Sequence, residues 1–366
     1  WSSDVCSSDL IRASAKAFGI LSSGLYTNKI RAIIRELSCN AVDSHREAGK
    51  QDTPFEIHLP TEIEPWFSVR DFGIGLDEEG VTKLYTTYFE STKTESNDYI
   101  GALGLGSKSP FSYTDNFTVT AIKNGVRGIY TAYINEHGIP SIAKLGDSET
   151  DECNGVEVKF GVTDRGDIRA FENEAHQVFK FFNNLPRVTG KPITLSQRTY
   201  VQRDVVPGVH IRQEGENRGA AVAIMGNSGY PIDLSSMPTE LPQELHQLVS
   251  NCDLDIEFEL GDIEFAASRE DLSYTPETVE AIVSRLREIN NQLKPVFDAQ
   301  VSKYSDNVWE FAQEFLDDVY SKNLFKGLAL AYVHDHPECM LTDSNAWGRT
   351  SRLARRSLRV SQRYLR

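Results

Sequence analysis

Three polar side chains, Glu36, Asn40 and Asp43, share one side of a helix predicted over residues 28–49. At 3.6 residues per turn, their spacing places them within about 60° of one another. The apolar residues expected on the opposite side, where they would pack against a sheet, are Ile30, Ile34, Leu37 and Ala41. Carboxylates can act as general bases, and oxygen donors bind Mg²⁺. By itself, the same row is also typical of a solvated polar helix face.

Two glycine-containing stretches follow this helix. Residues 66–70 alternate like a strand and lead into Asp71, Gly73 and Gly75. Further on, residues 100–109 form a glycine-rich loop that runs into a predicted helix. By itself, Asp71-Phe72-Gly73 is typical of a turn after a strand.

The three stretches, in this order, resemble the N-box, G1 box and G2 box of the GHKL ATPases. This superfamily comprises the ATP-binding domains of gyrase, Hsp90, histidine kinases and MutL. Within it, residues 17–145 resemble the phage RIIA-like proteins, named for a rapid-lysis locus of tailed phages. The segments that carry the resemblance are FGILSSGLYTNKIRAIIRELSCNAVDSH, DFGIGLD, YTTYFESTK and GALGLGSKSPFSYTDNF.

The resemblance implies a role for each polar residue of the first helix. Glu36 would polarise the attacking water as general base. Asn40 would supply a neutral oxygen ligand to Mg²⁺, which leaves most positions of the ion to water and phosphate oxygens. Asp43 would support the pocket through water or a nearby backbone group.

The resemblance also implies how the base and the phosphates of ATP are bound. Asp71 would accept a hydrogen bond from the adenine amino group, which favours adenine over guanine. Gly73 and Gly75 would let the backbone approach the base. Backbone N–H groups and a helix N-terminus would cradle the phosphates. The residues expected in this cradle are Gly101, Leu103, Gly104, Leu105, Gly106, Ser107 and Lys108. The residues expected in a lid that closes over ATP are Ser91, Thr92 and Lys93.

A second-domain segment, residues 265–272, resembles the Ser-Arg-Glu segment of the Hsp90 middle domain. The resemblance implies that Arg269 reaches the γ-phosphate and stabilises charge during transfer. The alternative is an exposed arginine paired with Glu270 or Asp271.

One position departs from the superfamily pattern. Many GHKL proteins carry Gly-Thr before the last strand, whereas this chain carries Gly155-Val156. The hydroxyl that helps to hold the adenine-side aspartate is therefore absent there, and we expect adenine to be bound weakly or by a different arrangement.

The order of elements predicts an α/β fold of the α+β sandwich kind. A GHKL Bergerat-type ATP-binding domain would span residues 11–187, and a ribosomal-protein-S5-like transducer domain would follow over residues 188–295. The expected elements include strands in AAVAIMG, LDIEFEL and IEFAAS, and helices over residues 169–184, 277–293 and 294–320. A truncated helical region would occupy residues 296–343. Residues 1–10 resemble a translated sequencing adapter, which implies that the natural N-terminus is missing.

Composition limits the function classes. Hydrophobic residues make up 40% of the 366-residue chain and charged residues 25%, as in ordinary globular proteins. The net charge of −15 disfavours nucleic acid as the main partner. No apolar run approaches the roughly 18 residues of a membrane span. The five cysteines lack metal-ligand spacing, which favours a reducing cytosol. The arginine-rich residues 344–366 are either a basic amphipathic helix for a membrane or nucleic acid, or an assembly artefact.

Several rival classes fail on spacing. A P-loop fails because Ser107 places Lys108 one residue late. A dinucleotide fold fails for want of a third glycine. A protein kinase fails for want of its catalytic aspartate and a preceding glycine-rich loop, and a histidine kinase lacks a phosphoacceptor helix pair.

Three hypotheses stay open. The first is a Mg²⁺-dependent ATPase switch in which ATP closes the lid, docks Arg269 and brings two chains together as a homodimer. The second is a nucleotide-binding scaffold without significant turnover. The third is an Hsp90-, MutL- or MORC-like ATPase that acts on protein or DNA. The RIIA resemblance implies a role in host lysis control, in the bacterial host cytoplasm or at the inner membrane face, with a companion RIIB-like protein.

Overall fold

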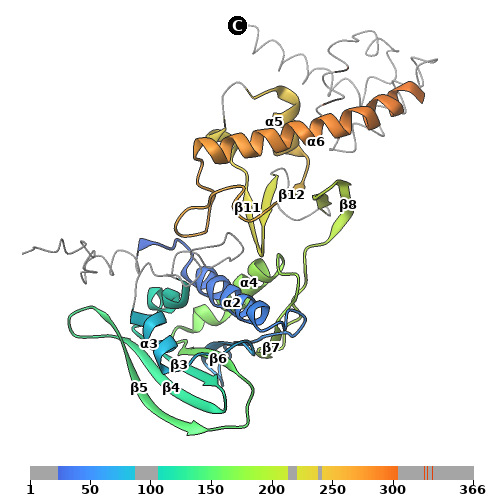
Figure 1. The fold of residues 1–366 in the computed structure, drawn as a ribbon. Coiled ribbons are helices and arrows are strands. Elements are labelled where there is room, and N and C mark those ends of the chain that lie inside the picture. The colour runs from blue at the N-terminus through green and yellow to red at the C-terminus, as the bar shows by residue number, and fades with distance from the viewer. Residues whose placement is uncertain are drawn as a thin grey trace, which may run out of the picture. The chain divides into compact units, whose positions relative to one another are not determined.

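The computed structural model describes residues 24–86, 106–212, 221–237 and 241–303, together with Phe325, Leu328 and Tyr332 (Figure 1). Contacts between Cα atoms divide the chain into two units. The first comprises Trp1–Arg198, Gly226–Ser228 and Phe265–Asp271. The second comprises Thr199–Met225, Gly229–Glu264 and Leu272–Arg366. The domain boundaries expected from the sequence stay predictions.

The first unit contains a seven-stranded sheet in the order β5-β4-β3-β6-β2-β1-β7. Neighbouring strands are antiparallel, except that β1 and β7 are parallel. Side chains alternate along each strand, and the inward row forms the core together with the helices. The strands are β1 (Glu56–Leu59), β2 (Trp66–Arg70), β3 (Asn116–Lys123), β4 (Val126–Ile134), β5 (Pro140–Glu149), β6 (Gly155–Gly161) and β7 (Arg187–Gly190).

Helix α2 (Lys29–Glu47) contacts this sheet at β2 and β6. It is capped by the preceding residue, Asn28, whose side-chain oxygen accepts a hydrogen bond from the Arg31 N–H. Ile34, Leu37 and Ala41 are buried, as the periodicity predicts, whereas Ile30 in the first turn is only partly buried. On the opposite side Glu36 and Asp43 are buried as well, and the alternative of a solvated polar face is therefore wrong for this helix.

The other helices of the first unit are α3 (Glu78–Thr86), the 3₁₀ helix η1 (Gly106–Ser112) and α4 (Arg165–Phe179). Helix α4 starts four residues earlier than the predicted helix over residues 169–184, because the Asp164 carboxylate caps it by accepting from the Gly166 N–H. Helix α2 has both α4 and η1 as neighbours, and these two elements also contact the sheet, at β1 and β3 respectively. The polar side chains of α2 are therefore held in a protein environment.

The second unit contains a five-stranded sheet in the order β11-β10-β12-β9-β8. Strands β10 and β12 are parallel, whereas β9 is antiparallel to both β12 and β8. The strands are β8 (Tyr200–Val206), β9 (Val209–Arg212), β10 (Val222–Met225), β11 (Ser228–Pro231) and β12 (Leu254–Phe258). The helical elements are η2 (Leu234–Ser236), α5 (Gln243–Asn251) and α6 (Pro276–Lys303).

Two predictions for this half of the chain are wrong. The segment IEFAAS does not extend as a strand, because the chain turns back and the Ala266 N–H donates to the Asp271 carbonyl. Helix α6 continues through Pro295 instead of ending before it. Burial of Leu293 and Phe297 on either side accounts for this continuity, since packing offsets the hydrogen bond that proline removes. No helix in the described ranges is long and apolar enough to span a membrane.

Candidate functional site

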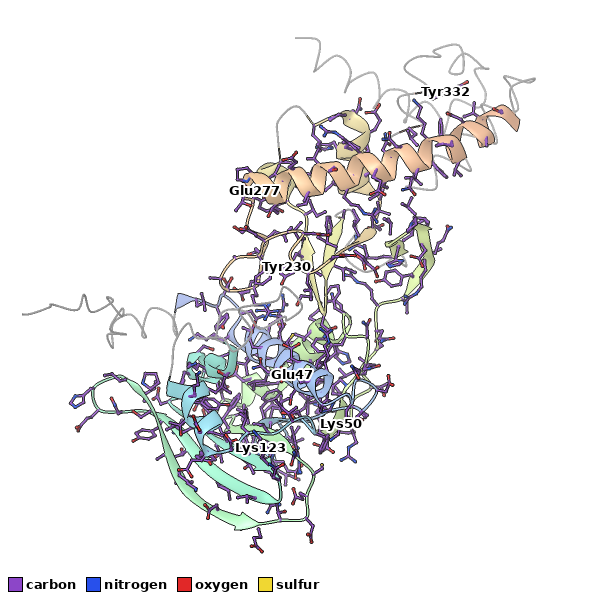
Figure 2. The ribbon with its side chains drawn as sticks, viewed as in Figure 1. Glu47, Lys50, Lys123, Tyr230, Glu277 and Tyr332 are labelled. Carbon is purple, nitrogen blue, oxygen red and sulfur yellow. The ribbon has the colours of Figure 1, made fainter. Side chains whose placement is uncertain are left out.

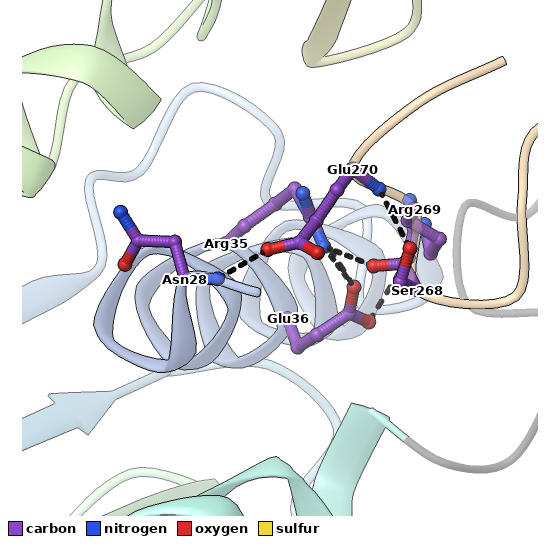
Figure 3. A network of polar contacts seen from close by, with 6 residues as sticks. All are labelled: Asn28, Arg35, Glu36, Ser268, Arg269 and Glu270. Carbon is purple, nitrogen blue, oxygen red and sulfur yellow. Dashed lines mark hydrogen bonds and ion pairs between the residues drawn. The ribbon is translucent and has the colours of Figure 1, made fainter. Parts of the chain in front are cut away.

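Glu36 lies on α2 with only 4% of its surface exposed, and two guanidinium groups hold its carboxylate. Oε1 accepts from Nε and Nη2 of Arg35, at 3.3 Å each. Oε2 accepts from Nη1 of Arg269 at 3.0 Å. Figure 3 shows these contacts. The charge of the buried carboxylate is therefore compensated, as burial of a charge requires.

Arg269 reaches Glu36 from the loop Phe265–Asp271, which belongs to the first unit. Its backbone has a φ of +54°, which is uncommon for a residue other than glycine. The Arg269 N–H donates to the Ala266 carbonyl at 2.7 Å, and the Phe265 ring lies 5.2 Å from the guanidinium. Arg269 is 5% exposed, so the alternative of a solvent-exposed pair with Glu270 or Asp271 is wrong.

The same loop is attached to α2 at two further points (Figure 3). The Ser268 carbonyl accepts from Nη2 of Arg35 at 2.8 Å. The Glu270 carboxylate accepts from the N–H groups of Thr27 and Asn28, at 2.8 and 2.7 Å. A carboxylate at a helix N-terminus is favourable because the first N–H groups lack intrahelical partners. Glu270 therefore anchors the loop at the start of α2, while Arg269 contacts Glu36 two turns further on.

Gly106 brings η1 against the Glu36 carboxylate. A Cβ atom at Gly106 would lie 2.7 Å from Oε2 of Glu36, so glycine is what lets this backbone approach. Ser107 and Ser109 follow Gly106 on η1, and their buried hydroxyls have no hydrogen-bond partner in the described part of the chain. Buried polar groups ordinarily have a partner. These hydroxyls therefore fit a site that receives a polar ligand such as the phosphates of ATP.

Two other predicted residues lie on the same helix as Glu36. Asn40 is half-buried and Asp43 is fully buried. Within the described ranges, no group of three or more His, Cys, Asp or Glu side chains is placed to hold a metal ion. Mg²⁺ bound through Asn40 would therefore depend on water and ligand oxygens for its other positions, as Mg²⁺ commonly does.

Asp71 follows β2 and is 7% exposed. Three donors, none of them charged, hold its carboxylate. Oδ1 accepts from the Ser44 hydroxyl and from the Gly73 N–H, at 2.9 Å each, and Oδ2 accepts from the Val156 N–H at 3.2 Å. Burial raises the pKa of Asp71, and these three hydrogen bonds oppose that rise.

The glycines around Asp71 are required by close backbone approaches. A Cβ atom at Gly73 would lie 2.1 Å from the Ser44 Oγ. At Gly75, which has a φ of +66°, a Cβ atom would lie 1.9 Å from the Ile122 carbonyl oxygen. At Gly155 it would lie 2.0 Å from the Asp71 carbonyl oxygen. The segment after β2 is therefore tightly packed between α2, β3 and β6.

The C-terminal end of α2 supplies three residues to this segment that the sequence analysis missed. Ser44 contacts Asp71, as described above. Nε2 of His45 accepts from the Phe72 N–H at 2.7 Å, and its Nδ1 lies 2.9 Å from the Thr53 carbonyl, which fixes the proton on Nδ1. Nζ of Lys50, just beyond α2, donates to the Phe72 carbonyl at 2.6 Å. Ser44 lies one turn after Asn40 on the same helix, and that spacing was the available signal for this residue.

Lys108 lies on η1, and its ammonium group donates to the Leu84 carbonyl at the end of α3, at 2.8 Å. The residue is 5% exposed, and burial lowers its pKa to about 8. The remaining predicted residues lie outside the described ranges: Ser91, Thr92, Lys93, Gly101, Leu103, Gly104 and Leu105.

Comparison with known proteins gives a partial match. The chain is 26% identical over 175 residues to the chaperone protein HtpG of Rickettsia akari (strain Hartford), covering 42% of this chain and 28% of that protein. It is 28% identical over 165 residues to HtpG of Rickettsia typhi (strain ATCC VR-144 / Wilmington), covering 39% and 26% of the two chains. The chain is distantly similar to an Hsp90 protein.

The matched region spans about a quarter of the length of these HtpG chaperones, so their activities as whole proteins come to this chain only as proposals. No family model matches the sequence. The similarity supports the Hsp90-like branch of the GHKL ATPases. It does not extend to the RIIA-like subfamily, which stays a prediction.

Proposed function

We propose that this chain is an Hsp90-like ATP-binding and ATP-hydrolysing conformational switch. A Bergerat-type domain over residues 11–187 would bind Mg·ATP, and a transducer domain over residues 188–295 would follow it. The observation that carries the proposal is a pair of buried carboxylates, Glu36 on α2 and Asp71 bonded to its C-terminal end. The distant HtpG similarity supports the same class of activity.

Asp71 would select the base. An ionised carboxylate has about four acceptor positions, and three are taken by Ser44, Gly73 and Val156. One position therefore remains on Oδ2 for an N–H donor, such as the amino group of adenine. The close backbone approaches at Gly73 and Gly75 keep the surrounding segment in place, so the carboxylate is presented without reorganisation.

Glu36 would act as the general base toward water. A base needs a carboxylate oxygen that can accept a proton, and in the structure both oxygens accept from arginines. Among the described residues, Arg269 is the one that bonds Oε2. Movement of Arg269 away from Glu36 would therefore free this oxygen. Asn40 would be a ligand of the Mg²⁺ ion of bound Mg·ATP, and the nucleotide would supply the phosphoryl group to be transferred.

A nucleotide-binding scaffold without turnover is the second candidate. The specific observation in its favour is the engagement of Glu36 by two guanidinium groups, since a carboxylate held in this way polarises water poorly. A role in phage lysis control with an RIIB-like partner, a nucleotide-dependent homodimer and association with the inner membrane stay predictions from the sequence.

The test is Mg²⁺-dependent ATP hydrolysis by the full chain and by Glu36→Ala, with ATP binding followed in parallel. We expect turnover to fall by roughly 10²- to 10⁴-fold in Glu36→Ala, because that is the usual contribution of a general base. ATP binding should survive. Glu47→Ala removes an exposed glutamate from the same helix and should leave both unchanged (Figure 2).

Binding without turnover in the unaltered chain would favour the scaffold. Absence of ATP binding in the unaltered chain would refute the site assignment.

A further inference from the structure

Ser44 contacts the Asp71 carboxylate through its side chain, and the proposed function gives this residue no role of its own. Its hydroxyl donates to Oδ1 of Asp71 at 2.9 Å and accepts from the Ile74 N–H at 3.3 Å. The other two donors to Asp71 are backbone N–H groups, those of Gly73 and Val156. Ser44 is therefore the side chain, among the described residues, on which the orientation of this carboxylate depends.

The packing around Ser44 leaves its hydroxyl little freedom. The segment after β2 crosses directly over it, since a Cβ atom at Gly73 would lie 2.1 Å from Oγ and 2.5 Å from the Ser44 carbonyl carbon. The hydroxyl consequently links α2 to both Asp71 and Ile74. If the Asp71 carboxylate rotated, it would lose the hydrogen bond from the Ser44 hydroxyl, whereas the N–H groups of Gly73 and Val156 would stay in place.

We propose that Ser44 is a positioning residue for base recognition: its hydroxyl saturates Oδ1 of Asp71, so that the open acceptor position on Oδ2 is presented to the exocyclic amino group of adenine. This inference rests on the proposed function. It also accounts for the missing hydroxyl at Val156, because α2 supplies a hydroxyl to the same carboxylate from another direction.

The pH dependence of binding distinguishes this role from a merely structural one. The ionisable groups brought close to Asp71 are His45 on α2, Lys50 in the following turn and Tyr85 on α3. Burial raises the pKa of Asp71, and the Ser44 hydrogen bond lowers it. Adenine recognition needs the ionised carboxylate. Loss of the Ser44 hydroxyl should raise the pKa of Asp71 further. As the solution is acidified, the Asp71 carboxylate would then be protonated, and ATP binding would weaken, at a higher pH than in the unaltered chain.

The experiment measures the affinity of the full chain for ATP and for inosine triphosphate, which carries a carbonyl oxygen where adenine has its amino group. In Ser44→Ala we expect ATP affinity to fall about tenfold, as for loss of one hydrogen bond to a charged group. Inosine triphosphate affinity should change less than about threefold, because this base offers Asp71 no amino group. Ser44→Thr, which keeps the hydroxyl, should restore ATP affinity and the pH profile.

Ser38→Ala is the matched control. Ser38 is a fully buried serine of α2 whose hydroxyl bonds none of the described residues, so its removal should change neither affinity. Two results with Ser44→Ala would overturn the inference while the proposed function stood. One is an equal loss of affinity for ATP and inosine triphosphate, and the other is an unchanged loss of ATP binding at acidic pH. Absence of ATP binding by the unaltered chain would overturn both.

Discussion

The two buried carboxylates at α2 are held in opposite ways. Neutral donors hold Asp71: one hydroxyl and two backbone N–H groups. Two arginines hold Glu36, one adjacent in sequence and one from a loop 233 residues away. Neutral donors fix the orientation of a carboxylate and leave its charge for a ligand. Guanidinium groups compensate the charge, so the carboxylate becomes available only when one of them moves.

Under the proposed function, this difference would separate base recognition at Asp71 from switching at Glu36. The segment around Asp71 is locked by backbone approaches that only glycine permits, as at Gly75. The surroundings of Glu36 consist of long side chains and a loop anchored through Glu270. We therefore expect substitutions around Asp71 to affect stability and base binding, and substitutions around Glu36 to affect turnover.

The largest expected effect comes from Gly75→Ala compared with Gly106→Ala. At Gly75 the new Cβ would meet a backbone oxygen at 1.9 Å, with φ at +66°. We expect Gly75→Ala to lower the free energy of unfolding by more than about 3 kcal/mol. At Gly106 the clash, at 2.7 Å, is with a side-chain oxygen of Glu36 instead of the backbone, so we expect a smaller loss of about 1–2 kcal/mol. Urea unfolding measures both, and equal losses would remove the contrast between the two regions.

The next largest effect is expected on base recognition. Asp71→Asn removes the negative charge and replaces one carboxylate oxygen with an NH₂ group. This NH₂ group would face a hydrogen-bond donor, such as the Ser44 hydroxyl or the Val156 N–H, that needs an acceptor. We expect ATP affinity to fall roughly 100-fold, about 2.7 kcal/mol. Glu36→Gln should change the affinity less than about threefold, because in the proposed function this carboxylate would serve turnover instead of base binding. Isothermal titration calorimetry compares the two variants. If Glu36→Gln lost as much affinity as Asp71→Asn, the proposed division of labour would be wrong.

Lys108 provides a pH test of how η1 packs against α3. Burial lowers its pKa from the ordinary value of 10.5 to about 8, so between these values the unfolded chain binds more protons than the folded chain. The free energy of unfolding should therefore contain a contribution from Lys108 that rises with pH across this window, by roughly 1–3 kcal/mol. We expect Lys108→Met to lose this contribution.

The comparison of the variant with the unaltered chain isolates Lys108 from other groups that titrate in this range. Lys123→Met removes a partly exposed lysine of β3 and should keep the pH dependence (Figure 2). Urea unfolding at several pH values supplies the measurement. Parallel curves for Lys108→Met and the unaltered chain would contradict a buried Lys108.

The smallest effect is expected at the loop anchor. Glu270→Gln removes a negative charge from the N-terminal end of α2, where the first N–H groups point at it. We expect a stability loss of about 0.5–1 kcal/mol. Glu47→Gln removes a charge at the opposite end of α2, where a negative charge is unfavourable, so it should be neutral or slightly stabilising. Thermal unfolding distinguishes the signs, and identical shifts would argue against the anchor.

Much of the candidate site was predictable because it depends on local pattern. The 3.6-residue period places Glu36, Asn40 and Asp43 on one helix, and the alternation of residues 66–70 places Asp71 at the end of a strand. Gly73 and Gly75 follow from the same motif. These features depend on residues close in sequence, so the chain itself specifies them.

The partners of these residues were not predictable in the same way. Periodicity shows which residues share a side of α2, but the polar side became buried only because η1 and the loop Phe265–Asp271 pack there. The same reasoning explains why the strand predicted in IEFAAS is wrong. The alternation of its residues favours a strand, but the chain turns back there.

By itself, the sequence determined the helix, the strand and the glycine spacing that bring two carboxylates to one region. The tertiary structure alone decided that Glu36 is paired with Arg269 and that Ser44 donates to Asp71. A buried charge or hydroxyl takes whichever partner the folded backbone brings within hydrogen-bond distance, and that depends on segments far apart in the chain.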